Sequence, residues 1–314
     1  LYIGNVPDAE ADRAVGKTTL STLLGRRAVR VLAPLYYGIA YALLAIGFSL
    51  VLGVARIINI AHTALFMTAA YLIYIGSKLM GLPLALAMAA SVGLTVLLGL
   101  VVYRLFIQPI QEHEAAVLIA TIAVAMMIQE VFLMSFGGHY LGVPPLVDGF
   151  MHVLGVKVTY QHLLALGLSL VMLLGVRHFL MSTRLGLALR STAQDREVAN
   201  LMGMDVNRVA RLTVAVSVGL AAMTGAIVVP LITVEPTMWM HPLIMMLAIV
   251  VLGGLGSIEG SFVGAYILGF AESLVVFVLP MGSFLKDSVA LSVMILVLLI
   301  RPEGLFGVSF EEER

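Results

Sequence analysis

The sequence predicts an all-α bundle of about eight membrane-spanning helices, with a short cytoplasmic helix between two of them. The composition is the first reason: 61% of the 314 residues are apolar and 11% are charged, whereas a soluble domain carries roughly 25% charged residues. The apolar residues also form continuous runs, which favours helices over the alternating strands of a barrel. A helix satisfies its own backbone polar groups in lipid. The net charge of zero offers no basic surface for nucleic acid.

Candidate spans are apolar stretches close to the roughly 20 residues that a crossing helix needs. Two of the candidates are short or contain helix-breaking features, so we expect about eight true spans. The stretch 57–75 carries Asn59 and His62 and fits a broken or re-entrant piece, and Ser257–Gly260 divides the seventh segment from the eighth. The nine segments are 32–54, 57–75, 82–107, 115–136, 160–181, 209–232, 243–257, 261–280 and 284–300.

The orientation follows from the arginines of the short loops, because cytoplasmic loops carry an excess of basic residues. The loop 182–211 is the richest in arginine, which predicts that it faces the cytoplasm, and residues 302–314 follow four segments later on the same side. The loop 137–159 carries a single lysine and is expected outside. The basic end of residues 1–30 favours the inside, yet nine full spans would place it outside. One fewer full span near 32–75 would remove this conflict.

The cytoplasmic loop contains the signals of one amphipathic helix. Ser191 and Gln194 fit a capping box, and Gly203 fits the left-handed position that ends a helix, which predicts a helix over 192–202. Such a helix is exposed to water, so its apolar stripe needs a partner, either the lipid surface or a docked soluble subunit. The stripe consists of Val198, Leu201 and Met202.

The same loop carries a family resemblance. Glu197-Val198-Ala199, followed after three residues by Gly203, resembles the coupling loop (here about 190–208) of bacterial ABC importer permeases. The wider run from Ala193 to Arg208 resembles that of the branched-chain amino acid permeases of the LivH type. Three further blocks agree with this family in order, at 38–71, 253–260 and 301–307, although Glu259 and Glu303 stand where the family more often has proline and glutamine. The resemblance covers residues 35–307.

The resemblance implies a transport subunit and not an enzyme. A permease domain over 31–301 would be followed by a cytoplasmic tail, 302–314, and preceded by a polar extension, 1–30, that the resemblance does not cover. The family implies cytoplasmic ABC ATPase subunits, a second similar permease and an extracytoplasmic binding protein, with no cofactor in this chain. It places the chain in the lipid of the bacterial or archaeal cytoplasmic (inner) membrane. Its substrates are leucine, isoleucine and valine, or urea, short amides and other amino acids.

An ion-coupled secondary transporter of a small solute is the alternative function. A carrier of that kind needs no docking helix, so the coupling-like loop argues against it. Glu130, Glu235 and Glu272 lie within or beside apolar segments, where a proton-coupled carrier would use carboxylates as relays. Their scattered positions favour interior or boundary roles.

Polar residues inside apolar segments are the candidate pathway residues, because such groups usually face the bundle interior or a water-filled path. Arg56, Asn59 and His62 recur every three residues, as if on one helical face. Asn59 and His62 suit either a substrate pathway or interhelical hydrogen bonding. His62 has no second ligand at a plausible spacing, so we expect no metal site.

Glycines at intervals of four residues predict close helix packing, because small residues let helices approach each other. Such packing fits a contact within this chain as well as one with a partner permease. The residues are Gly256, Gly260 and Gly264.

Overall fold

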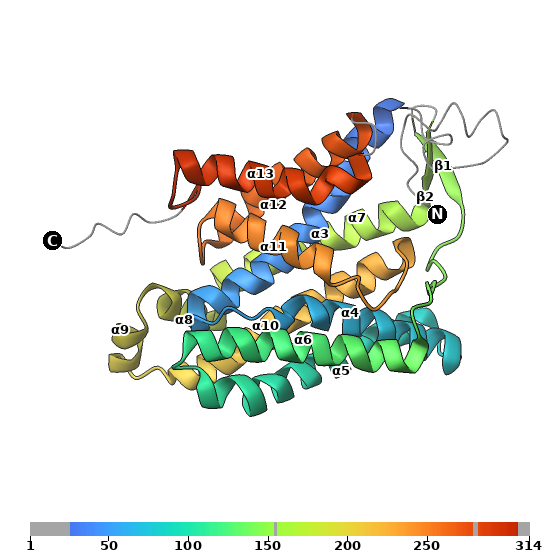
Figure 1. Cartoon of the computed structure of the whole chain (residues 1–314). Coiled ribbons are helices and arrows are strands. Elements are labelled where there is room, and N and C mark those ends of the chain that lie inside the picture. The colour runs from blue at the N-terminus through green and yellow to red at the C-terminus, as the bar shows by residue number, and fades with distance from the viewer. Residues whose placement is uncertain (1–25, 154–155, 279–281, 307–314) are drawn as a thin grey trace.

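The computed structural model describes residues 26–153, 156–278 and 282–306, and it forms a bundle of long helices running between two ends (Figure 1). The predicted extension 1–30 therefore lies almost wholly outside the described residues, and the tail is described only to residue 306. The long helices are α3 (Arg26–Ala55), α4 (Ala61–Tyr74), α5 (Leu84–Val102), α6 (Glu114–Phe136), α7 (Tyr160–Ser182), α10 (Val206–Val228), α11 (Met240–Gly253), α12 (Ile258–Val278) and α13 (Gly282–Ile300).

The remaining elements are short and lie at the ends of the bundle. Strands β1 and β2 pair antiparallel, with Phe150 opposite Thr159. Helices α8 and α9 lie at the other end, together with the end of α13 (Figure 1). These elements are η1 (Ile75–Leu79), η2 (Tyr103–Ile107), η3 (Gln108–Ile110), β1 (Phe150–Val153), β2 (Val156–Thr159), α8 (Arg184–Gln194), α9 (Arg196–Leu201) and η4 (Val229–Leu231).

Each apolar segment of the sequence contributes a helix. In the described residues, five helices are long and apolar enough to cross a membrane, and shorter apolar helices occupy Ala40–Ala55, Met240–Gly253 and Ser288–Ile300. The expected number of about eight spans stays a prediction. The division between the seventh and eighth segments is earlier than expected: it lies at 254–257, and Ile258 already begins α12.

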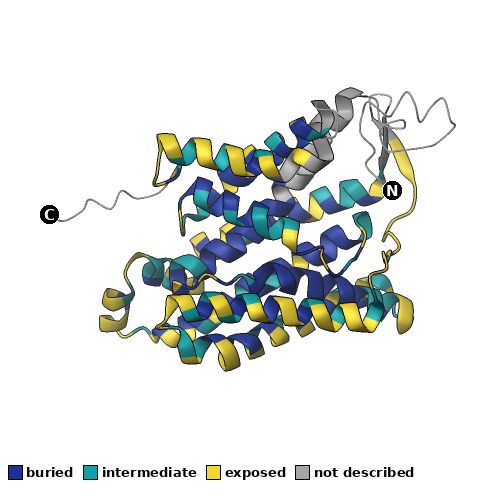
Figure 2. Ribbon diagram, viewed as in Figure 1, coloured by how far each residue is buried: buried dark blue, intermediate teal, exposed yellow. Residues whose placement is uncertain are grey.

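Helix α10 is largely buried and packs against α3, α4 and α5. Lipid supplies no hydrophobic force between helices, so close packing and small residues must hold them together. Gly99 on α5 faces Val218 on α10, where a Cβ atom would lie 2.7 Å from a methyl carbon. Many large apolar side chains are exposed, among them Leu299 of α13 at 77%, and Figure 2 shows exposed residues along α13. This distribution suits a bundle surrounded by lipid.

Candidate functional site

The first polar site lies at the break between α3 and α4. Arg56 has a φ of +54°, and residues 56–59 are not helical. Asn59 is buried just before α4, and its carbonyl oxygen accepts a hydrogen bond of 3.2 Å from the backbone N–H of His62. The predicted common helical face of Arg56, Asn59 and His62 is therefore wrong, because the backbone changes direction at Arg56. Helix α4 is continuous from Ala61 to Tyr74, and the expectation that the stretch 57–75 is a broken or re-entrant piece stays a prediction.

The His62 ring lies in the interior between three helices. Its Nδ1 is 3.3 Å from the Ser217 hydroxyl of α10, and its ring packs edge-on against Phe48 of α3 at 6.2 Å between centroids. Gly47 allows this approach, because a Cβ there would lie 3.1 Å from both His62 Cε1 and the Ser217 carbonyl oxygen. The structure thus gathers polar groups from three helices that are far apart in the sequence.

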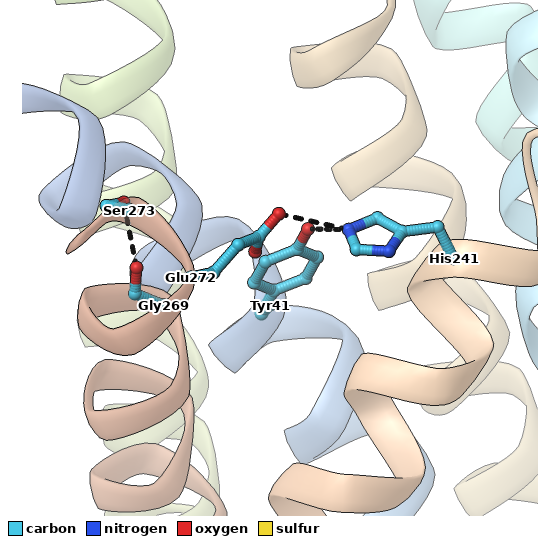
Figure 3. Close-up of polar contacts among 5 residues, drawn as sticks. All are labelled: Tyr41, His241, Gly269, Glu272 and Ser273. Atoms are coloured by element: carbon cyan, nitrogen blue, oxygen red, sulfur yellow. Dashed lines mark hydrogen bonds and ion pairs between the residues drawn. The ribbon is translucent and has the colours of Figure 1, made fainter. Parts of the chain in front are cut away.

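A second polar cluster joins α3, α11 and α12 (Figure 3). The Nε2 atom of His241 lies 2.8 Å from the Tyr41 hydroxyl and 3.1 Å from Oε1 of Glu272. Glu272 is buried, which confirms the interior role expected for it, whereas Glu130 lies on the exposed side of α6. Sequence reasoning missed Tyr41 and His241. Their position as polar residues within apolar helices was the available signal.

One nitrogen facing two oxygens restricts where the hydrogens of this cluster can be. If Nε2 carries hydrogen, it can donate to both oxygens in a shared bond; if it does not, it accepts from the Tyr41 hydroxyl and from a protonated Glu272. Either arrangement links the beginning of α11 to the middle of α3 and to α12. The cluster therefore acts at least as an interhelical contact in the bundle interior.

The third site is the pair of short helices α8 and α9, where a single helix over 192–202 was expected. That expectation is wrong, because Asp195 is extended and ends α8. Its Oδ1 accepts hydrogen bonds from the N–H groups of Glu197 and Val198, at 2.9 and 3.0 Å, and so caps α9. The capping box at Ser191 is also wrong. An aspartate side chain can accept hydrogen bonds from backbone N–H groups that would otherwise bond to carbonyl oxygens of a continuous helix. Aspartate is also one of the residues preferred just before the first turn of a helix.

The predicted apolar stripe is nevertheless exposed on α9. Val198 is 52% exposed, Leu201 84% and Met202 78%, whereas Ala199 is buried. Glu197 lies in the first turn of α9. Gly203 has a φ of +84°, which confirms the left-handed position, and no atom lies within 4 Å of the place of its missing Cβ. Figure 2 shows α9 as a protruding, mostly exposed element.

Comparison with known proteins identifies the family. The model of the family "Branched-chain amino acid transport system / permease component" matches residues 30–299. The chain belongs to this permease family.

Individual relatives agree over nearly their whole length. The permease is 32% identical to the high-affinity branched-chain amino acid transport system permease protein BraD of Pseudomonas aeruginosa over 86% of this chain and 92% of that protein. It is 29% identical to LivH of Escherichia coli, again over 86% of this chain and 92% of that protein. A probable LivH of Methanocaldococcus jannaschii is 26% identical over 88% of this chain and 91% of its own. The permease is therefore an integral, multi-pass protein of the cytoplasmic membrane.

A solved structure shares the fold. PsaBC from Streptococcus pneumoniae, in complex with a Fab, superimposes with a TM-score of 0.51 at 16% identity, covering 95% of this chain and 98% of that one. At this identity the likeness concerns only the arrangement of the helices.

Two of the sequence blocks that carry the family resemblance lie together in the permease. The N–H groups of Leu305 and Phe306 donate to the carbonyl oxygens of Leu252 and Gly253, at 2.8 and 3.0 Å. Gly304, with a φ of +81°, lies against the backbone of Gly254. The end of the described chain thus packs on the turn between α11 and α12.

The three glycines of the predicted packing motif do not share one helical face. Gly256 lies before α12 with a φ of +79°, where it approaches Gly53 of α3. Gly260 and Gly264 face α11 within the same chain: a Cβ on Gly260 would overlap the Gly253 carbonyl, and one on Gly264 would lie 2.8 Å from the Ile249 carbonyl oxygen. Close packing at Gly260 and Gly264 is therefore internal to the permease.

A metal site has no support in the part of the chain that the structure describes, because no three His, Asp or Glu side chains are grouped to hold an ion.

Proposed function

We propose that this permease is the transmembrane subunit of an ABC importer that moves branched-chain amino acids, or a related small solute, by ATP-driven alternating access. Family membership supports the transport role, and the relatives named above are permeases of branched-chain amino acid transport systems. The protruding apolar surface of α9 is the structural observation that carries the ATP-driven part, because a carrier that works alone needs no such surface. The chain itself would catalyse no reaction and hold no cofactor.

The cytoplasmic ATPase would dock on residues 192–203. Three exposed apolar side chains lie together at the end of a capped helix, and grouped exposed apolar side chains mark sites that contact another protein or a membrane. Helix α8 packs against both α3 and α7, so movement of α8 and α9 would be transmitted directly to two long helices. Closure of the ATPase could then change which end of the bundle is open.

The other partners follow from the same proposal. Residues 182–208 and 302–314 would face the cytoplasm and 137–159 the outside, where an extracytoplasmic binding protein would deliver substrate. The end of α13 lies with α8 and α9, and the β1–β2 hairpin lies at the opposite end (Figure 1), which is the relative arrangement that this topology needs. A second, similar permease subunit would complete the pathway. Asn59 and His62 would line it.

The change Gly203→Val tests the proposal. A side chain at the φ of +84° strains the turn by about 1–2 kcal/mol, which is too little to unfold the bundle, and the space around Gly203 is open. We expect the variant to insert normally but to lose co-purification with the ATPase and to uncouple ATP hydrolysis from uptake in reconstituted membranes. Uptake by the wild-type chain alone, driven by a proton or sodium gradient, would overturn the proposal in favour of an ion-coupled secondary transporter.

A further inference from the structure

The beginning of α4 is a helix N-terminus inside the bundle. Ala61, His62 and Thr63 form its first turn, and each is at most 1% exposed. Two N–H groups at this end have partners. That of Ile60 donates to the Thr121 hydroxyl of α6 at 3.3 Å. That of His62 donates to the Asn59 carbonyl oxygen at 3.2 Å. The remaining N–H groups of a first turn and the positive end of the helix dipole favour a negative group.

Three polar side chains around this turn supply the second observation. Asn59 Oδ1, His62 Nε2 and Thr63 Oγ1 are buried and make no hydrogen bond of good geometry among the described residues, with the Leu44 backbone of α3 within reach of the His62 ring. Side chains of a helix tilt toward its N-terminus, so those of His62 and Thr63 lean toward the same end that Asn59 precedes. A buried polar atom without a partner destabilises a protein. Three such polar atoms at one helix end indicate a binding site for a ligand.

Each of these three side chains can place a hydrogen-bond donor here. The Ser217 hydroxyl lies 3.3 Å from His62 Nδ1. If it donates there, a neutral imidazole carries its hydrogen on Nε2. Thr63 contributes a hydroxyl hydrogen. The side-chain amide of Asn59 can be rotated by 180°, which puts its NH₂ group at the position of Oδ1. Donors on three side chains, next to a helix N-terminus, match a carboxylate.

We propose that the N-terminal turn of α4, with Asn59, His62 and Thr63, binds the carboxylate of the amino acid that the permease transports. This inference rests on the proposed function and adds to it the substrate group that is recognised. The turn is closed in this conformation, and the close contact of Gly47 on α3 with His62 and Ser217 is one of the contacts that close it. Separation of α3 from α4 and α10 would open it, as alternating access requires.

Two buried threonines of α4 provide a matched pair of variants. The Thr63 hydroxyl has no partner among the described residues, whereas the Thr68 hydroxyl donates to the Ala64 carbonyl oxygen at 2.9 Å. Both side chains are at most 3% exposed. Thr63→Val and Thr68→Val therefore remove the same atom from similar surroundings, and only the first removes a proposed substrate contact.

The measurement is direct binding of radiolabelled leucine, isoleucine and valine to the purified complex of permeases and ATPases, without the binding protein. This avoids the binding protein's own recognition of the carboxylate. We expect Thr63→Val to weaken binding by about 10- to 100-fold, the usual range for losing a hydrogen bond to a charged group, and Thr68→Val to leave it unchanged. Leucinamide, which lacks the carboxylate, should fail to compete with leucine on the wild-type complex.

The outcomes separate this inference from the proposed function. Unchanged affinity of Thr63→Val, or competition by leucinamide equal to that of leucine, overturns the carboxylate site even if ATP-driven uptake of these amino acids is intact. A wild-type complex that neither binds nor takes up any of the three amino acids overturns this site together with the branched-chain substrate of the proposed function.

Discussion

The contact between α11 and α12 makes a quantitative prediction for Gly260→Ala. The added Cβ would overlap the Gly253 carbonyl oxygen and lie 2.6 Å from its carbon, whereas carbon atoms in contact are normally about 3.5–4.0 Å apart. The two helices must therefore separate by about 1 Å. Overpacking of this kind costs about 1–3 kcal/mol, and a backbone contact has no flexible side chain that could relieve it.

The assay is unfolding of the purified permease in detergent, followed by circular dichroism. Gly93→Ala is the matched control, because Gly93 is also in a helix, α5, and nothing lies within 4 Å of its missing Cβ. There alanine should leave the free energy of unfolding unchanged or raise it by up to about 1 kcal/mol, the advantage of alanine over glycine in a helix. If Gly260→Ala is as stable as wild type and the control, the close approach of α11 and α12 described here is wrong.

Three further predictions concern orientation, the pathway and the second polar cluster. Ser191→Cys should resist an impermeant thiol reagent added to intact cells, and labelling from outside would reverse the topology; the chain has no cysteine of its own. Asn59→Leu and His62→Leu should lower transport while the complex still assembles, and a failure to assemble would favour a purely structural role. Tyr41→Phe should lower the free energy of unfolding by only about 0.6 kcal/mol, as measured for interhelical hydrogen bonds in membranes, and a loss of several kcal/mol would contradict a contact role.

The local features of the coupling region show how far sequence patterns reach. The left-handed φ of Gly203 depends on glycine at a helix end, so a sequence pattern could predict it. The division into α8 and α9 depended on Asp195, whose side chain competes with the helix for the same N–H groups. A pattern that allows both a capping box and an aspartate cap does not reveal which one the backbone adopts.

The sequence by itself determined the class of this protein, because long apolar runs in lipid can satisfy their backbones only as helices, and its motifs carried the family. The tertiary structure alone decided which polar groups meet. Tyr41 and Glu272 are 231 positions apart in the sequence, yet both lie within hydrogen-bond distance of the same nitrogen, Nε2 of His241. Ser217 likewise contacts His62 from another helix. Helical periodicity fixes which residues share a face of one helix, but contacts between helices depend on how small residues such as Gly47 and Gly260 let backbones approach.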